Sequence, residues 1–225
     1  MTNTLFRKLV ISITTIVAGI VAAAGLAAGD QAERLAMPLE LARNQAGAML
    51  MAEEIERQAL GVADDVHVAA RGAETSAAIA EHEARRSAGG SSRAEETDEP
   101  GELARAARLF EAIAETNPDY LQVRLIGAAG EGPEIIRFDR LEAGAPVERI
   151  RESELQPKGT RPYVVDTLRL SLGDVYVSPI ELNEEHDHVQ EPYIPVVRVG
   201  TPVAGADGDV VGLVIINVEL RRLFA

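Results

Sequence analysis

The chain has 225 residues and a formal net charge of -14, from 22 basic and 36 acidic side chains. This length allows one globular domain with extensions, and the negative charge excludes a broad electrostatic attraction to nucleic acid or to anionic lipid headgroups. The sequence contains no cysteine, which excludes disulfides, thiolate nucleophiles and zinc–thiolate sites.

The first predicted element is an uncharged apolar run at residues 9–29, LVISITTIVAGIVAAAGLAAG. It is long enough to cross a bilayer as a helix. Basic residues precede it and acidic residues follow it, so we expect residues 1–8 in the cytoplasm and a single-pass signal anchor in the cell membrane. The alternative is a signal peptide that is cleaved near Ala22–Ala24. Both alternatives place the body of the chain outside the cytoplasm, in the periplasm or its equivalent.

The second predicted element is one long helix over residues 30–87. At 1.5 Å per residue it would be roughly 85 Å long, which is more than a small domain can cover. A second copy of the same helix is the simplest partner for its apolar stripe, so we expect a homodimer. The stripe follows three- and four-residue steps and consists of Ala48, Met51, Ile55, Ala59, Val62, Val66 and Ala69.

The remaining segments predict an α+β domain at residues 103–225. Residues 88–102 form a linker rich in glycine, serine and acidic residues, and a second helix runs from Leu103 to the Asn117–Pro118 pair. Short strand-like runs then predict an antiparallel sheet of about five strands with flanking helices. The predicted strands are Leu121–Ile126, Glu134–Asp139, Tyr176–Ile180, Val196–Val203 and Val210–Glu219.

The order and spacing of several segments resemble the Cache sensory domains, which are PAS-like extracytoplasmic modules of bacterial receptors. The segments are NPDYLQVRLI, EIIR, RPY, YVSPIELN, PYIPVVRVGTPV and GDVVGLVIIN, and the likeness covers about residues 104–224. The nearest likeness is to the membrane-distal module of the double-Cache sensors of histidine kinases. It implies a ligand-sensing region whose long helix leads to a histidine kinase or diguanylate cyclase output domain, which lies outside this chain.

The same resemblance implies a ligand pocket. Arg161 and Tyr163 belong to an RPY segment that is similar to the Arg-Pro-Trp-Tyr pocket segment of many Cache domains, and Tyr176 would supply an aromatic wall. Asn217 stands where amino-acid-binding Cache domains tend to carry an aspartate. We therefore expect a small organic anion, a mono- or dicarboxylate, because guanidinium binds carboxylate and Asn217 has no negative charge for an ammonium group.

Arg124 and Arg137 interrupt two otherwise apolar strands. We interpret them as surface cations that pair with Glu134, Asp139 or Glu191 and hold together the outer face of the sheet or a helix contact, because strand alternation turns half of all side chains outward. The alternative interpretation is a guanidinium cluster that clamps an anion.

The polar segment NEEHDHVQE, residues 183–191, could hold a metal ion through His186 and His188. A solvated loop is the preferred interpretation, so we expect no metal and no cofactor. The sequence lacks the glycine-rich, P-loop, Gly-x-Ser-x-Gly and His-Glu-x-x-His motifs, so we expect no enzymatic activity. The alternatives to a receptor's sensing region are an exported small-molecule-binding or scaffold protein without signalling output and, third, an extracytoplasmic hydrolase.

Overall fold

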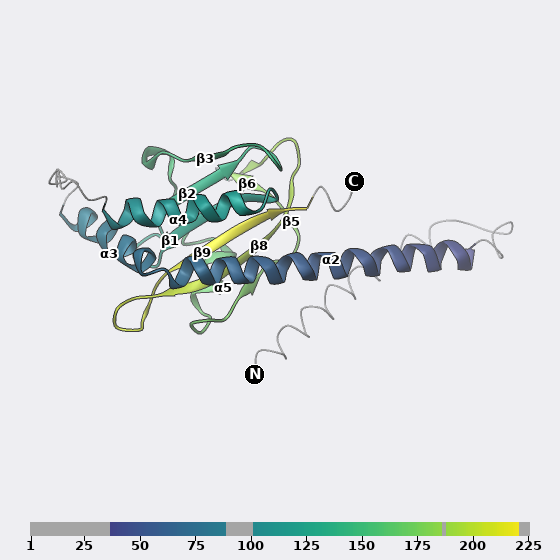
Figure 1. The fold of residues 1–225 in the computed structure, drawn as a ribbon, viewed down its shortest axis with the longest axis horizontal. Helices are drawn as coiled ribbons and strands as arrows, with labels where there is room; N and C mark the ends of the chain where they lie inside the picture. The colour runs from purple at the N-terminus through teal and green to yellow at the C-terminus, as the bar shows by residue number, and fades with distance from the viewer. Residues whose placement is uncertain (1–36, 89–100, 186–187, 221–225) are drawn as a thin grey trace. The chain divides into compact units, whose positions relative to one another are not determined.

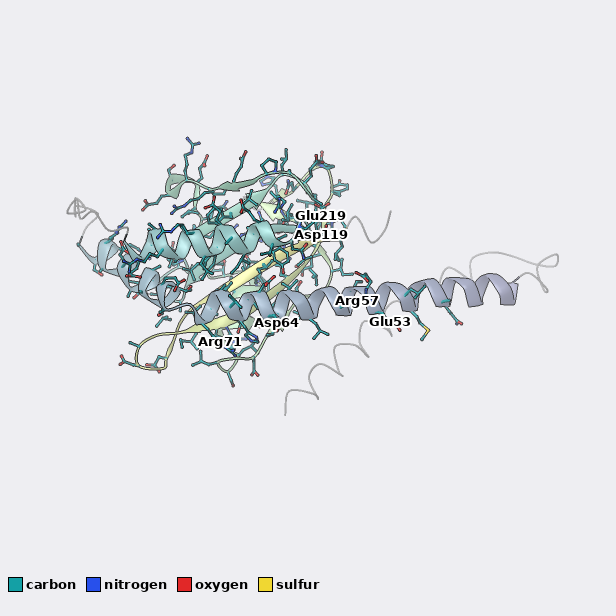
Figure 2. All side chains as sticks on the ribbon, viewed as in Figure 1. Glu53, Arg57, Asp64, Arg71, Asp119 and Glu219 are labelled. Atoms are coloured by element: carbon teal, nitrogen blue, oxygen red, sulfur yellow. The ribbon has the colours of Figure 1, made fainter. Side chains whose placement is uncertain are left out.

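The computed structural model describes residues 37–88, 101–185 and 188–220, and the chain divides into two compact units, residues 1–60 and 61–225. The described part of the first unit is a stretch of helix α2 (Met37–Arg71). Charged side chains such as Glu53 and Arg57 project from it, and Arg57 forms an ion pair with Glu54 (Figure 2). Within the described residues no helix is both long and apolar enough to cross a membrane. The predicted anchor at residues 9–29 lies outside those residues.

The predicted long helix is broken at Gly72, which corrects the expectation of one continuous element. Gly72 has a non-helical ψ of 126°, and a new helix, α3 (Ala73–Ser87), starts after it. A Cβ atom at this position would lie 2.9 Å from Leu109 Cδ2, so the end of the Leu109 side chain would have to shift to accept it. The Thr75 hydroxyl donates a hydrogen bond of 2.7 Å to the Ala69 carbonyl and so satisfies a carbonyl that the broken helix leaves open.

The apolar stripe of the long helix is partly covered by the second unit itself. Val62, Val66 and Ala69 are buried in its hydrophobic core. This end of the stripe therefore has its partner within the same chain, since the residues that follow in the sequence fold back over it, and the expected homodimer stays a prediction. Large apolar side chains that remain exposed on α2 are Met49, Leu50, Leu60 and Val68.

Helix α4 (Glu102–Thr116) ends beside Asn117–Pro118 as predicted, and most of the preceding linker lies outside the described residues. The sheet has seven strands in the order β3-β2-β1-β9-β8-β4, with β5 also paired to β8, and neighbouring strands are antiparallel (Figure 1). A separate hairpin contains β6 (Glu184–Glu185) and β7 (His188–Val189). The seven strands are β1 (Tyr120–Gly127), β2 (Glu134–Arg140), β3 (Val147–Arg149), β4 (Tyr176–Val177), β5 (Glu181–Leu182), β8 (Pro195–Ala204) and β9 (Val210–Glu219).

This architecture confirms the predicted α+β class. All of the predicted strands are present, although the one expected at Tyr176–Ile180 is limited to β4, and the short strands β3 and β5 were not foreseen.

The two faces of the sheet are covered by different elements. One face packs against α3 and α4, where Phe110 is completely buried beside Val123 and Ile216. The other face contacts the short helix α5 (Pro162–Leu168) through Tyr163 and Val164. Because both faces are covered, polar side chains on either face of the central strands are buried. A site built from these side chains is therefore a buried one.

Candidate functional site

A row of polar side chains crosses the sheet on the face that α5 covers. Gln122 on β1 is the register partner of Asp139 on β2 and of Asn217 on β9, and Asn217 is the partner of Arg198 on β8. Directly opposite residues of antiparallel strands project from the same face, a few ångströms apart. The fold therefore brings these four side chains together from distant parts of the chain. The strand register alone explains why these four side chains lie next to one another.

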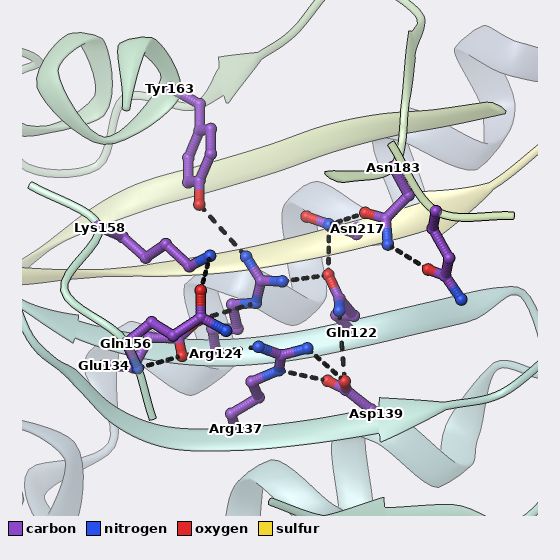
Figure 3. A network of polar contacts seen from close by, with 11 residues as sticks. Gln122, Arg124, Glu134, Arg137, Asp139, Gln156, Lys158, Tyr163, Asn183 and Asn217 are labelled. Carbon is purple, nitrogen blue, oxygen red and sulfur yellow. Dashed lines mark hydrogen bonds and ion pairs between the residues drawn. The ribbon is translucent and has the colours of Figure 1, made fainter. Parts of the chain in front are cut away.

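Arg124 is the centre of the network (Figure 3). It is only 2% exposed and is among the largest fully buried side chains. Its Nη1 donates to the Tyr163 hydroxyl at 3.2 Å, its Nη2 donates to Gln122 Oε1, and its Nε lies 3.3 Å from Glu134 Oε1 in an ion pair. The guanidinium thus links the sheet to α5.

A β-bulge places Glu134 beside this guanidinium. The pairing of β1 with β2 shifts between Leu125 and Ile126, so that Ile126 is paired with Glu134. Glu134 and Arg137 are three residues apart and would face opposite sides of a regular strand. The bulge turns both inward, and Glu134 Oε2 lies 3.7 Å from Arg137 Nη1 and accepts a hydrogen bond of 3.0 Å from the Gln156 backbone N–H.

Arg137 completes this part of the network through Asp139. Its Nε donates to Asp139 Oδ1 at 2.7 Å, and its Nη2 forms a second bond to Asp139 Oδ2. The partners Glu134 and Asp139 agree with the sequence-based expectation, as does the contact of Arg124 with helix α5 through Tyr163, but the expected surface location was wrong. Arg124 and Arg137 are buried rather than on an outer surface, because α5 and the segment around Gln156 cover this face.

Asn217 sits in the middle of the row and is 1% exposed. Its Nδ2 donates to Gln122 Oε1 at 2.7 Å and to Asn183 Oδ1 at 3.1 Å, and Asn183 in turn donates to Gln190 (Figure 3). Asn217 Oδ1 is buried and has no hydrogen-bond partner within the described residues. A buried acceptor without a partner is costly and calls for an explanation.

Arg198 is held from several sides. Its Nη1 forms an ion pair with Glu181, and its guanidinium carbon lies 5.2 Å from the centre of the Tyr163 ring. The Arg198 backbone N–H donates to the Ser178 hydroxyl at 2.9 Å. Its Nε is buried and has no hydrogen-bond partner among the residues that the structure describes.

The residues predicted to bind ligand all lie around this network. Arg161 occupies the position before the first residue of α5 and pairs with Glu184 at 3.0 Å, with about a quarter of its side chain exposed. Tyr163 contacts Arg124 and Arg198 as described above. Tyr176, on β4, is half-buried and packs against the apolar cluster that contains Tyr163. Burial, and next the charge of Glu181, raise the pKa of the Tyr176 hydroxyl, which therefore stays a hydrogen-bond donor. Their binding roles remain predictions.

Sequence reasoning missed the network partners Gln122, Lys158 and Asn183, which are all buried. The Lys158 ammonium donates to Gln156 Oε1 at 2.9 Å. A signal was present, since Gln122 and Arg124 alternate with apolar residues on one strand, as Arg137 and Asp139 do on another. All of these positions point to one face, and the error was to assume that this face meets water.

A cavity of about 600 Å³ is lined by residues of α3, α4, β2 and β3 and by the segment around Gln156, and it includes Glu134 and Gln156 of the network. Its lining includes His82, Arg86 and Arg149 together with apolar side chains. Burial, and next the neighbouring Arg86, lower the pKa of His82. For metal binding, the described residues contain no cluster of histidine and acidic side chains that could hold an ion, and His186 lies outside them.

No protein-family model matches the sequence, and no curated protein matches it either. Solved structures do resemble the chain. The extracellular domain of vpHK1S-Z8, described as a histidine kinase, has 19% identity and a TM-score of 0.49, with 76% of this chain and 61% of that one covered. A domain of a sensory box/GGDEF family protein from Vibrio parahaemolyticus has 18% identity and a TM-score of 0.48, with 74% and 62% covered.

The ligand-binding domain of the Campylobacter jejuni chemoreceptor Tlp3, solved with L-norvaline, has 12% identity and a TM-score of 0.39, with 75% of this chain and 61% of that one covered. The chain therefore spans less than two thirds of the length of each of these structures. Sensory domains of a histidine kinase, a sensory box/GGDEF family protein and a chemoreceptor are thus among the structures that this chain is similar to.

Proposed function

We propose that this chain is the extracytoplasmic ligand-sensing region of a membrane-bound signal-transduction receptor of the histidine kinase type. The observation that carries the proposal is the buried network around Arg124, with its unpartnered donor on Arg198 and acceptor on Asn217. A fold that needs only stability is served as well or better by apolar side chains at such positions. Charged groups are nevertheless present there, and a donor and an acceptor have no hydrogen-bond partner within the described residues. This favours a site in which a ligand supplies the missing partners.

The proposed ligand is a small organic anion, bordered by Arg161, Tyr163 and Tyr176 with Asn217 at the floor. Buried cationic side chains on this face are Arg124, Arg137, Lys158 and Arg198, whereas among the described residues of the network Glu134 is the one carboxylate buried to the same degree. This imbalance favours an anion. No catalytic role is proposed for this region.

A screen of mono- and dicarboxylates against the purified 225-residue chain tests the proposed function. Once a ligand is found by thermal shift, calorimetry should show that Arg161→Ala binds it roughly ten- to a hundredfold more weakly, because a hydrogen bond to a charged group contributes about 1.5–3 kcal/mol. Arg169→Ala is the matched control, since Arg169 ends the same helix, is exposed and pairs only weakly with Asp166. Equal affinities of the Arg161→Ala variant and the parent would remove Arg161 from the site.

Membrane attachment is the next part of the proposal, and it rests on the sequence of residues 1–29. A phosphatase reporter that is fused after Ala225 should be active, because the charges that flank the apolar run predict export of the C-terminal side. Activity of a reporter that works only in the cytoplasm, at the same fusion point, would contradict export by either an anchor or a signal peptide.

We also propose a homodimer through α2. Met49 and Leu60 are 64% and 51% exposed, and they lie about three helical turns apart on one side of the helix. Met49→Glu with Leu60→Glu should weaken dimerisation at least tenfold in sedimentation equilibrium, because the new carboxylates would lose water in the interface. The exposed Arg57→Glu variant is the control. A parent chain that is monomeric at high micromolar concentration would refute the dimer.

The alternative function is an exported binding or scaffold protein without signalling output. The two functions differ in whether ligand binding changes the arrangement of the helix pair. Spin labels at the exposed Gln45 of α2 would report this change as a shift in the distance between the two copies. A shift on ligand addition supports the sensor, and an unchanged distance supports the alternative.

A further inference from the structure

The hydrogen-bond network fixes which atom of each amide points where. Asp139 can only accept a hydrogen bond and the Arg124 guanidinium can only donate, since carboxylates lack hydrogens and guanidinium lacks acceptors. Gln122 lies between them, with its Nε2 at 3.3 Å from Asp139 Oδ2 and its Oε1 bound by Arg124 Nη2. Rotation of this amide by half a turn would place two donors and two acceptors against each other. The orientation of Gln122 is therefore set by its charged neighbours.

Gln122 in turn sets the orientation of Asn217. Because Gln122 Oε1 is an acceptor, the Asn217 atom at 2.7 Å from it must be the amide nitrogen. The same nitrogen donates to Asn183 Oδ1 at 3.1 Å. Asn217 Oδ1 is consequently the atom that remains without a partner in the described part of the chain, and it is a neutral acceptor held in place through two neighbouring side chains.

The next strand places an unpartnered donor beside this acceptor. Arg198 is the direct register partner of Asn217, so both side chains project from the same face, with Cβ atoms about 4.5–5.5 Å apart. Arg198 is fixed by Glu181 and by the Tyr163 ring, while its Nε–H has no partner within the described residues. The site thus presents one charged donor and one neutral acceptor side by side.

We infer that the ligand is a carboxylate with a hydroxyl group on the adjacent carbon, a 2-hydroxy acid. Its carboxylate would accept from Arg198 Nε–H, and its hydroxyl would donate to Asn217 Oδ1. An ammonium group could also donate to Asn217 Oδ1, but it would add positive charge beside Arg124 and Arg198 and would meet no buried carboxylate at Asn217. This inference rests on the proposed function and specifies the ligand of that same site.

Calorimetry with matched acids on the full chain tests the inference. The probes are lactate, propionate and alanine, which differ only in the substituent on one carbon, together with the pairs 2-hydroxybutyrate and butyrate, and malate and succinate. In at least one series the hydroxy acid should bind at least about fivefold more tightly than the acid without hydroxyl, because the latter leaves Asn217 Oδ1 buried and unpaired. Lactate should also bind more tightly than alanine.

Two variants then assign the preference to Asn217. Asn217→Leu should bind the hydroxy acid and its partner acid with affinities within about twofold of each other. Asn183→Leu removes a partner of the Asn217 nitrogen, leaves Oδ1 in place, and should retain the preference. Equal binding of both acids in every pair that the parent chain binds would overturn the hydroxyl inference alone, even if Asn217→Leu does not fold. Absence of binding by every acid would instead refute the proposed organic-anion sensor.

Discussion

Replacement of Arg124 by methionine is expected to lower the free energy of unfolding by about 3–5 kcal/mol, because it leaves a buried charge without its partner. The carboxylate of Glu134 is completely buried, and after the change it would lose Arg124, the closer of these two cationic partners, and keep Arg137 at 3.7 Å. Gln122 and the Tyr163 hydroxyl would also lose a donor. Small domains are stable by only about 5–15 kcal/mol, so urea denaturation should show a large decrease in the midpoint.

The double variant Arg124→Met with Glu134→Gln separates two effects of the single change. These are the unpaired charge left on Glu134 and the altered packing at position 124. Glutamine keeps an oxygen for the Gln156 N–H but carries no charge. The double variant should therefore be more stable than Arg124→Met alone by at least about 1 kcal/mol, a non-additive result that is typical of residues in direct contact. Arg105→Met, on an exposed pair with Glu102, is the control and should change stability by less than about 0.5 kcal/mol. An effect of Arg124→Met as small as the control's would mean that the network does not hold the fold together.

Replacement of Gly132 by alanine is the second large effect, and we expect a loss of about 3–5 kcal/mol. Gly132 has a φ of +65°, and a Cβ atom there would lie 2.5 Å from Gly159 Cα, a backbone atom that no side-chain movement can clear. The two backbone segments are joined by a hydrogen bond of 2.8 Å from the Lys158 N–H to the Gly132 carbonyl. This crossing places Gln156 and Lys158 over the network.

Gly144 provides a matched control for this prediction. It also has a positive φ, of +83°, but no atom lies within 4 Å of where its Cβ would be. Gly144→Ala should cost only the left-handed backbone conformation, about 1–2 kcal/mol. Urea denaturation gives the loss of unfolding free energy for each variant. The difference between the two losses is the cost of the close backbone approach of Gly132 to Gly159. Similar losses at the two positions would show that the segments at Gly132 and Gly159 separate without penalty.

The sequence by itself determined the α+β class, the second helix and the position of every long strand. The alternation of apolar residues and turn signals such as Asp207–Gly208 are properties of short stretches of sequence. They can be recognised without knowing which strands are neighbours in the sheet. The end of α4 was equally predictable, because the Asn117–Pro118 pair cannot continue a helix. Helical periodicity did not reveal the break of the long helix at Gly72, where the backbone ψ is 126°.

Tertiary structure alone decided where Arg124 lies and what it contacts. Strand alternation established that Gln122 and Arg124 share a face, but not that α5 and the segment around Gln156 cover that face. The bulge between β1 and β2 turned Glu134 toward Arg124, against its position in a regular strand. Burial and partner choice depend on contacts between residues that are far apart in the chain. The network that supports the proposed function therefore depends on the register between strands. That register cannot be read from the sequence pattern of any single strand.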